Sequence, residues 1–340
     1  MSTQGPVLVT GSAGFIGFHT AQRLLARGET VIGVDNLNAY YDPTLKQARL
    51  DRLLVHPAYV HHTLDLADRE GMAAMFAKHA PRRIVHLGAQ AGIRYSVENP
   101  ETYVDSNVVG FLTVLEGARA TRVEHLVFAS TSSVFGANAA LPFSVQQGTA
   151  HPLNVYSATK LANEAMAHAY AYIFGIPSTG LRFFTVYGPW GRPDMALFKF
   201  TRAILEGRPI DVYGEGAMER DFTYVDDIVD GVVAALDDVP ARDPSWRAES
   251  PSPATSGVAP WRILNLGAGR RERLSRYIEV LERALGREAV LNLMPTQEGE
   301  MTRTEADVSE TRASLGYEPR TPIDEGVTRF VDWYRGFYSV

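Results

Sequence analysis

The fold of this chain is decided by the stretch Val7-Leu8-Val9-Thr10-Gly11-Ser12-Ala13-Gly14-Phe15-Ile16-Gly17. Its first four residues are typical of a short buried strand, and the residues after it follow an amphipathic helical pattern that ends near Gly28. Between strand and helix, Gly11 permits a tight turn, Gly14 lets the backbone approach a pyrophosphate, and Gly17 lets the helix lie close to the strand. The stretch therefore predicts a strand, a glycine turn and a helix whose N-terminus binds phosphate.

A carboxylate follows the second predicted strand. Residues 30–34 form an apolar run that ends in Asp35, about twenty residues beyond the glycine turn. In a dinucleotide site such a carboxylate holds both ribose hydroxyls, and it would repel a 2′-phosphate. The alternative is that Asp35 only caps the strand, but this would leave the preceding glycine pattern unexplained. Asp35 therefore favours NAD over NADP.

Apolar runs and helical patterns alternate through about the first 185 residues. Strand-like runs at 59–62, 83–87, 125–129 and 178–183 are separated by helical patterns at 69–79, 101–120 and around residue 156. This alternation predicts an α/β fold with a Rossmann-type doubly wound parallel sheet. We assign residues 1–188 to an NAD-binding domain, to which a helix and a strand within 222–268 return. Residues 189–221 and 269–340 are assigned to a smaller α/β substrate domain, and the Pro- and Ser-rich stretch 243–260 to a flexible surface loop.

The composition excludes several classes of function. With 340 residues, of which 45% are hydrophobic, the chain can bury a large core. A formal net charge of −6 and the lack of a polybasic run argue against a nucleic-acid partner. The chain has no cysteine, which excludes disulfides and thiolate metal sites, and we predict no bound metal. The N-terminus lacks a signal-peptide pattern and no apolar run would span a bilayer, so a cytoplasmic protein without a membrane partner is expected.

The sequence Tyr156-Ser157-Ala158-Thr159-Lys160 carries the candidate chemistry, because residues four apart share one face of a helix. A chance pair on a solvated helix is the alternative. A phenol titrates near ~10, and bringing its pKa to neutrality needs about three units, or about 4 kcal/mol. A nearby ammonium and an oxidised nicotinamide supply this, so Tyr156 is predicted to be a general base and Lys160 its activator. Thr131, Ser132 and Ser133 follow the fifth strand, where their hydroxyls either grip a substrate oxygen or only cap the strand.

Six stretches, residues 10–17, 35–38, 86–96, 156–160, 182–195 and 220–224, carry a resemblance that covers nearly the whole chain. The sequence resembles the extended short-chain dehydrogenase/reductases of the NAD-dependent epimerase/dehydratase type, and among them the bacterial UDP-glucuronate 4-epimerases. The resemblance implies that Asp65 and Leu66 flank the adenine, that Leu87 and Ala89 line the cofactor, and that Asn107 supports the active-site helix. It also implies a homodimer built from two helices of each subunit. The whole predicted cofactor set is Gly11, Ala13, Gly14, Phe15, Ile16, Gly17, Asp35, Asn36, Asn38, Asp65, Leu66, Leu87, Ala89, Gln90, Asn107, Tyr156 and Lys160.

Cationic side chains define the predicted substrate site. Arg220 resembles the family arginine that holds the pyrophosphate of a UDP-sugar. Arg192, in a Gly- and Pro-flanked loop, is predicted to contact a C6 carboxylate; the alternative is an arginine that faces solvent. Arg94 is a second cationic candidate, and Thr185 a hydrogen-bond donor. The predicted set also includes Gln297 and Glu300, the latter in place of an Asp that is usual near the uridine ribose.

The residues after Thr131 discriminate among related reactions. Sugar 4,6-dehydratases of this superfamily carry an Asp-Glu pair there and nucleotide-uronate decarboxylases a Glu, whereas this chain has Ser132 and Ser133. Phe135 replaces a family Tyr. We therefore predict NAD-dependent interconversion of UDP-glucuronate and UDP-galacturonate by C4 oxidation, rotation of the keto sugar and re-reduction. A UDP-glucose/UDP-galactose 4-epimerase, a UDP-uronate decarboxylase and a non-catalytic dinucleotide sensor are the alternatives.

Overall fold

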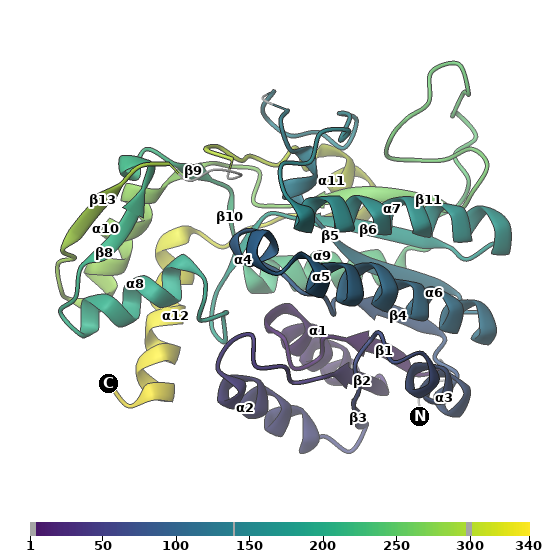
Figure 1. The fold of residues 1–340 in the computed structure, drawn as a ribbon, viewed down its shortest axis with the longest axis horizontal. Helices are drawn as coiled ribbons and strands as arrows, with labels where there is room; N and C mark the ends of the chain where they lie inside the picture. Colours follow the sequence, from purple (N-terminus) through teal and green to yellow (C-terminus); the bar gives the residue numbers. More distant parts are fainter. Residues whose placement is uncertain (1–4, 139, 297–300) are drawn as a thin grey trace.

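The computed structural model describes residues 5–138, 140–296 and 301–340. Its centre is a parallel sheet of seven strands in the order β11-β6-β5-β4-β1-β2-β3 (Figure 1). The strands are β1 (Val7–Thr10), β2 (Val31–Asp35), β3 (Tyr59–Thr63), β4 (Arg83–His86), β5 (His125–Thr131), β6 (Ser178–Phe183) and β11 (Trp261–Leu266). The order reverses between β1 and β4, as in dinucleotide-binding sheets. The prediction of a Rossmann-type doubly wound sheet is confirmed.

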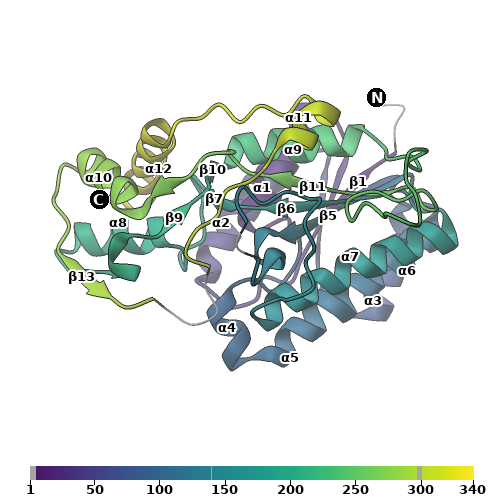
Figure 2. The ribbon, with the colours of Figure 1, turned by 90° about the horizontal axis from the view of Figure 1, so that it is seen from above.

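Helices cover both faces of this sheet (Figure 2). One face carries α1 (Phe15–Ala26), α2 (Pro43–Leu54) and α9 (Val225–Asp237), and the other α3 (Arg69–His79), α6 (Gly110–Thr121) and α7 (Val155–Phe174). Successive residues of β1 enter different cores, because Val7 and Val9 pack on one face and Leu8 on the other. Burial on both faces explains why these strands read as continuous apolar runs.

The predicted helix at 101–120 is divided in the structure. The chain forms α4 (Ile93–Glu98), α5 (Pro100–Tyr103), a π-helical segment η1 (Val104–Val109) and then α6. The π-helical segment inserts an irregular turn, and it places Asn107 in the protein interior. Apolar periodicity does not reveal such a segment, because its residues remain helical in pattern.

A smaller domain lies beyond the carboxyl ends of the sheet strands, at the left of Figure 1. It contains α8 (Ala196–Leu205), α10 (Leu274–Leu285), α12 (Ile323–Tyr338) and the parallel pair β8 (Ile210–Tyr213) and β13 (Leu291–Met294). Two further pairs, β7 (Thr185–Tyr187) with β10 (Phe222–Tyr224) and β9 (Glu219–Arg220) with β12 (Glu272–Arg273), connect it to the sheet. Helix α11 (Ser309–Leu315), which falls within the predicted substrate domain, packs instead on β11 and α9.

The stretch 243–260 contains internal contacts. The amide of Asp243 donates to the carbonyl oxygen of Ser256 at 2.9 Å, and Ala254 and Ala259 are fully buried. These contacts anchor the base of the loop that projects at the upper right of Figure 1. The flexibility of this loop stays a prediction. Within the described residues, no helix is long and apolar enough to cross a membrane.

A buried carboxylate joins three distant segments. Asp221 accepts hydrogen bonds from the amides of Ala268 at 2.6 Å, Gly269 at 3.0 Å and Ala306 at 3.0 Å. Burial raises the pKa of Asp221, and the hydrogen bonds oppose that rise. The side chain thereby ties the segment before β10 to the end of β11 and to the returning C-terminal chain.

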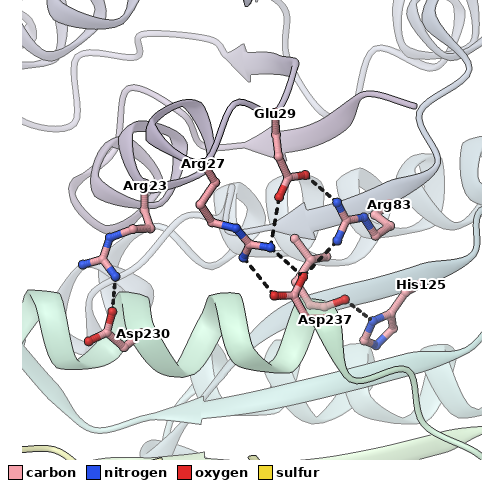
Figure 3. A network of polar contacts seen from close by, with 8 residues as sticks. Arg23, Arg27, Glu29, Arg83, His125, Asp230 and Asp237 are labelled. Carbon is pink, nitrogen blue, oxygen red and sulfur yellow. Dashed lines mark hydrogen bonds and ion pairs between the residues drawn. The ribbon is translucent and has the colours of Figure 1, made fainter. Parts of the chain in front are cut away.

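Charged side chains fasten the C-terminal end of α9 to the start of β4 (Figure 3). Arg83, at the start of β4, pairs with Glu29 and with Asp237 of α9, and Arg27 pairs with the same two carboxylates. The side chains of Arg83 and Glu29 are each only 9% exposed, so this pair is largely shielded from water. By contrast, the pair Arg23–Asp230 is solvent-exposed.

Replacing Glu29 by Gln is expected to lower the free energy of unfolding by about 2–3 kcal/mol, because it leaves the buried Arg83 with only the half-exposed Asp237. Urea denaturation followed by fluorescence measures this change. The matched control is Asp230→Asn, which breaks an exposed pair between α1 and α9 and should cost less than about 1 kcal/mol. Equal losses in the two variants would contradict the distinction.

Candidate active site

A cavity of about 1130 Å³ lies between the carboxyl edge of the sheet and the smaller domain. Its lining extends from Gly11 in the glycine turn to Arg220 in β9. Its walls include nearly all of the described residues predicted for the site. Those lining it are Gly11, Gly14, Phe15, Ile16, Gly17, Asp35, Asn36, Asn38, Asp65, Leu66, Leu87, Ala89, Gln90, Arg94, Thr131, Ser132, Ser133, Tyr156, Lys160, Thr185, Arg192 and Arg220.

The glycine turn has the geometry that the sequence predicts. Gly11 adopts a left-handed φ of 68°, and a Cβ on Gly17 would stand 2.0 Å from the carbonyl oxygen of Gly11. Helix α1 begins directly after Gly14, which provides no side-chain cap. The first amides of α1 therefore remain available to an anion, as a pyrophosphate requires. These residues fit NAD.

Two predicted cofactor residues, Ala13 and Asn107, lie behind the cavity wall rather than in it. The amide of Ala13 donates to the carboxylate of Asp35 at 3.1 Å, and the amide of Leu37 donates to the same carboxylate at 2.9 Å. Ala13 is fully buried. The Ala13 amide is therefore used within the protein, where its hydrogen bond orients the Asp35 carboxylate.

Asn107 connects the cavity wall to the helix that carries Tyr156. Its side chain accepts from the amide of Gln90 at 2.8 Å and donates to the hydroxyl of Thr159 on α7 at 3.0 Å. The backbone carbonyl oxygen of Asn107 accepts a hydrogen bond from the side chain of Asn163 at 2.6 Å. Asn107 thus joins Gln90 to α7 by hydrogen bonds, and the supporting role that the resemblance implies stays a prediction.

Tyr156 and Lys160 lie one helical turn apart on α7, and both face the cavity. Burial raises the pKa of Tyr156, whereas the Thr131 hydroxyl and the charge of Arg192 lower it. The Lys160 ammonium donates to the carbonyl oxygen of Ala129 in β5 at 3.0 Å, and its role as the activator of Tyr156 stays a prediction. The sequence alone did not reveal this acceptor near the end of the strand.

Glu164, one further turn along α7, was missed by the sequence reasoning. Its carboxylate accepts from Ser130 at 2.6 Å and makes two hydrogen bonds with Arg182, at 3.0 and 2.8 Å. Ser130 is therefore not free to hold a substrate oxygen. Burial lowers the pKa of Lys160 to about 8, and the charge of Glu164 opposes this fall. The spacing of four residues after Lys160 was the available signal.

Arg192 has a carboxylate partner that was also missed. Its Nε lies 3.0 Å from Oδ1 of Asp194, two residues later, and the two side chains form a bidentate pair. The phenol of Tyr40 donates to Asp194 at 3.3 Å. Burial disfavours the charge of Arg192, but Asp194 raises its pKa above the usual range. Arg192 is therefore a fixed cation at the cavity wall, and a substrate carboxylate would share it with Asp194.

Three further predicted substrate residues, Arg94, Thr185 and Arg220, also line the cavity. Arg220 donates to the carbonyl oxygen of Thr302 at 2.9 Å, and the guanidinium of Arg94 lies 4.6 Å from the ring centre of Tyr213. Thr185 lies at the start of β7. Gln297 and Glu300 fall outside the described residues.

The sheet, glycine turn and Tyr-Lys pair together define a nucleotide-dependent enzyme of the Rossmann class. The chain belongs to the NAD dependent epimerase/dehydratase family, whose model matches residues 7–245. It is 46% identical to a probable UDP-glucuronate 4-epimerase of Rhizobium meliloti, covering 96% of both chains, and 52% identical to an uncharacterised 37.6 kDa protein of Escherichia coli O111:H-, covering 98% and 99%. A crystal structure of UDP-glucuronic acid 4-epimerase from Bacillus cereus, with UDP-glucuronic acid and NAD, superimposes with a TM-score of 0.87 at 30% identity, covering 98% of this chain and all of that one.

Replacing Glu164 by Gln should move the alkaline limb of the pH–rate profile to lower pH. In the wild-type protein the ammonium of Lys160 is lost as the pH rises through about 8, and without the Glu164 carboxylate burial lowers that pKa further. The pH dependence of turnover measures the shift. Glu116→Gln, an exposed carboxylate on α6, is the control and should leave the limb in place. An unshifted limb in a folded Glu164→Gln variant would sink the assignment.

Proposed function

We propose that this chain interconverts UDP-glucuronate and UDP-galacturonate. The family membership and the named relatives support a UDP-uronate epimerase. The observation that carries the proposal is that Tyr156, Lys160 and Arg192, a cation held in place by Asp194, line the same cavity. A uronate whose carboxylate contacts Arg192 would therefore bring its ring close to the phenol. C4, only two carbons from the carboxylate, is then the natural site of reaction.

The proposed reaction begins at the C4 hydroxyl. Tyr156, as phenolate, takes the O4 proton, and the Thr131 hydroxyl donates a hydrogen bond that holds the same oxygen. NAD, when bound, accepts the C4 hydrogen with its electron pair and later returns it. The 4-keto uronate turns in the cavity, and Tyr156 gives its proton back to O4 when C4 is reduced from the opposite face. Protons and electrons balance without net oxidation.

A 4-keto uronate is a β-keto acid, and the site must prevent loss of carbon dioxide. Decarboxylation requires the bond from C5 to the carboxylate to align with the carbonyl π-system. We propose that Arg192, Thr185 and the hydroxyls of Ser132 and Ser133 hold the carboxylate away from that alignment. All four residues line the cavity. The partly buried pair with Asp194 limits how far Arg192 can move.

We also propose that the chain forms a homodimer through helices on the side of the molecule that carries α7 and η1. Large apolar side chains are exposed on this side, including Val104 of η1 and Tyr172 and Ile173 of α7. Pairing two such faces would remove this apolar surface from water. Sedimentation velocity should give twice the 37.4 kDa mass of the chain, and a monomer at micromolar concentration would refute the dimer.

The direct test is incubation of the purified protein with UDP-glucuronate, with and without added NAD, followed by NMR. UDP-galacturonate should form and carbon dioxide should not. Tyr156→Phe should lower turnover by at least about a thousandfold while NAD still binds, because the phenol is the proposed proton carrier. Release of carbon dioxide would identify a decarboxylase instead. Turnover of UDP-glucose but not of UDP-glucuronate would identify a UDP-glucose/UDP-galactose 4-epimerase.

Replacing Arg192 by Ala should lower kcat/KM for UDP-glucuronate about ten- to a hundredfold more than for UDP-glucose, because only the uronate loses a charge-assisted contact. Steady-state kinetics with both sugars measure the difference. Arg202→Ala, on α8 at the outer wall of the cavity, is the control and should affect both sugars alike. Equal losses for both sugars in Arg192→Ala would remove the carboxylate role.

A further inference from the structure

A fully buried arginine, Arg49, lies behind the cavity wall and is absent from the cavity lining. It belongs to α2, and neither the glycine pattern nor the predicted substrate set includes it. Among the described residues, the acceptors of its hydrogen bonds are neutral oxygens: the carbonyls of Ala13, Trp190 and Gly191 and the phenol of Tyr41. A buried cation held by neutral oxygens is costly. Its position therefore calls for a function.

The two ends of the Arg49 guanidinium contact two different loops. Nη1 donates to the carbonyl oxygen of Ala13 in the glycine turn at 2.9 Å. Nη2 donates to the carbonyl oxygens of Trp190 at 2.6 Å and Gly191 at 3.2 Å. Gly191 directly precedes Arg192. One side chain therefore connects the turn at the phosphate end of the cofactor site with the loop that carries the carboxylate-binding arginine.

The second loop has a strained backbone. Trp190 has a φ of 63°, a left-handed conformation that is unfavourable for a residue with a large side chain. Its ring is fixed by packing against Phe18 and Trp333, at centroid distances of 5.5 and 5.2 Å. The preceding carbonyl, of Pro189, accepts a hydrogen bond from His19 at 2.9 Å. Arg49 thus holds the carbonyls at and just after the strained residue, where the chain turns toward Arg192.

We infer that Arg49 is a positioning residue that couples the glycine turn to the 188–194 loop and thereby sets the selectivity of the site for a uronate. The inference rests on the proposed function for its substrate. Arg49 itself does not line the cavity. It acts by fixing the backbone from which Arg192 and Asp194 project into the cavity.

The geometry requires an arginine rather than any cation. The guanidinium presents separated donors in a rigid plane, so its two nitrogens serve carbonyls on two loops at once. A lysine ammonium is a single point with three donors. Lys at this position retains the charge and satisfies one of the two loops, but it cannot connect them.

The test compares Arg49→Lys with Arg52→Lys. Arg52 lies one turn further along α2, is exposed, and contacts Trp190 only through the ring, at 4.8 Å from the ring centre. The measured quantity is the ratio of kcat/KM for UDP-glucuronate to kcat/KM for UDP-glucose. Arg49→Lys should lower this ratio about tenfold, mainly through KM for the uronate, whereas Arg52→Lys should leave it unchanged.

A second background separates positioning from a general structural effect. In Arg192→Ala the carboxylate contact is already lost, so adding Arg49→Lys should not lower the ratio further. An unchanged ratio in Arg49→Lys, or an equal fall in the Arg192→Ala background, would overturn the inference. If Arg49→Lys does not fold, Arg49→Gln keeps one amide donor group, which serves one loop but not both, and buries no charge. It should lower the ratio in the same direction, and an unchanged ratio there would also overturn the inference.

The proposed function and the inference fail in different ways. If the wild-type protein with bound NAD does not turn over UDP-glucuronate, the proposed function is wrong. The inference is then decided by calorimetric titration of the wild-type and Arg49→Lys proteins with each UDP-sugar. A selective loss of uronate affinity supports it, and equal affinities in the two proteins refute it.

Discussion

Helix α1 passes so close to the carbonyl oxygen of Gly11 that there is no room for a Cβ on Gly17. This approach fixes the glycine turn, and the turn fixes the backbone N–H and the backbone carbonyl of Ala13. The Ala13 amide orients Asp35, and its carbonyl accepts from Arg49. The position of the 190–191 carbonyls follows, because they accept from the same guanidinium. One steric constraint near the N-terminus thus reaches both the ribose carboxylate and the loop that carries Arg192.

Helix α7 carries a row of polar side chains in which positive and negative charges alternate. Tyr156, Lys160 and Glu164 follow one another at intervals of one helical turn, and Arg182 of β6 completes the row. Lys160, Glu164 and Arg182 are all buried, and charges in such a row stabilise one another where water cannot. Burial alone would reduce the charge on Lys160. The Glu164 carboxylate counters that effect, while the bidentate contact with Arg182 fixes the carboxylate itself.

Local sequence patterns predicted the central sheet, the glycine turn, Asp35 and the Tyr156–Lys160 pair, because each depends on residues close together in the chain. The π-helical segment around Asn107 escaped prediction because its residues keep a helical apolar pattern. Arg49 and Glu164 escaped because their partners lie on other segments: Trp190 is 141 residues from Arg49, and Arg182 is 18 residues from Glu164. Asp194 was within reach, two residues after Arg192, but a loop offers no periodicity to reveal the pairing. The predicted roles in cofactor and substrate binding stay predictions.

The buried carboxylate of Asp221 has a consequence for how the chain is synthesised and folds. Its partners include the amide of Ala306, 85 residues later, and the strand β11 reaches back to pair with β6. Contacts between such distant residues form only after long loops have closed, which slows folding. On the ribosome, the edge of the sheet and the segment that carries Arg220 would stay incomplete until nearly the whole chain has emerged. A fragment ending at residue 188 would therefore expose an unpaired β6, and it should not behave as an independent nucleotide-binding domain.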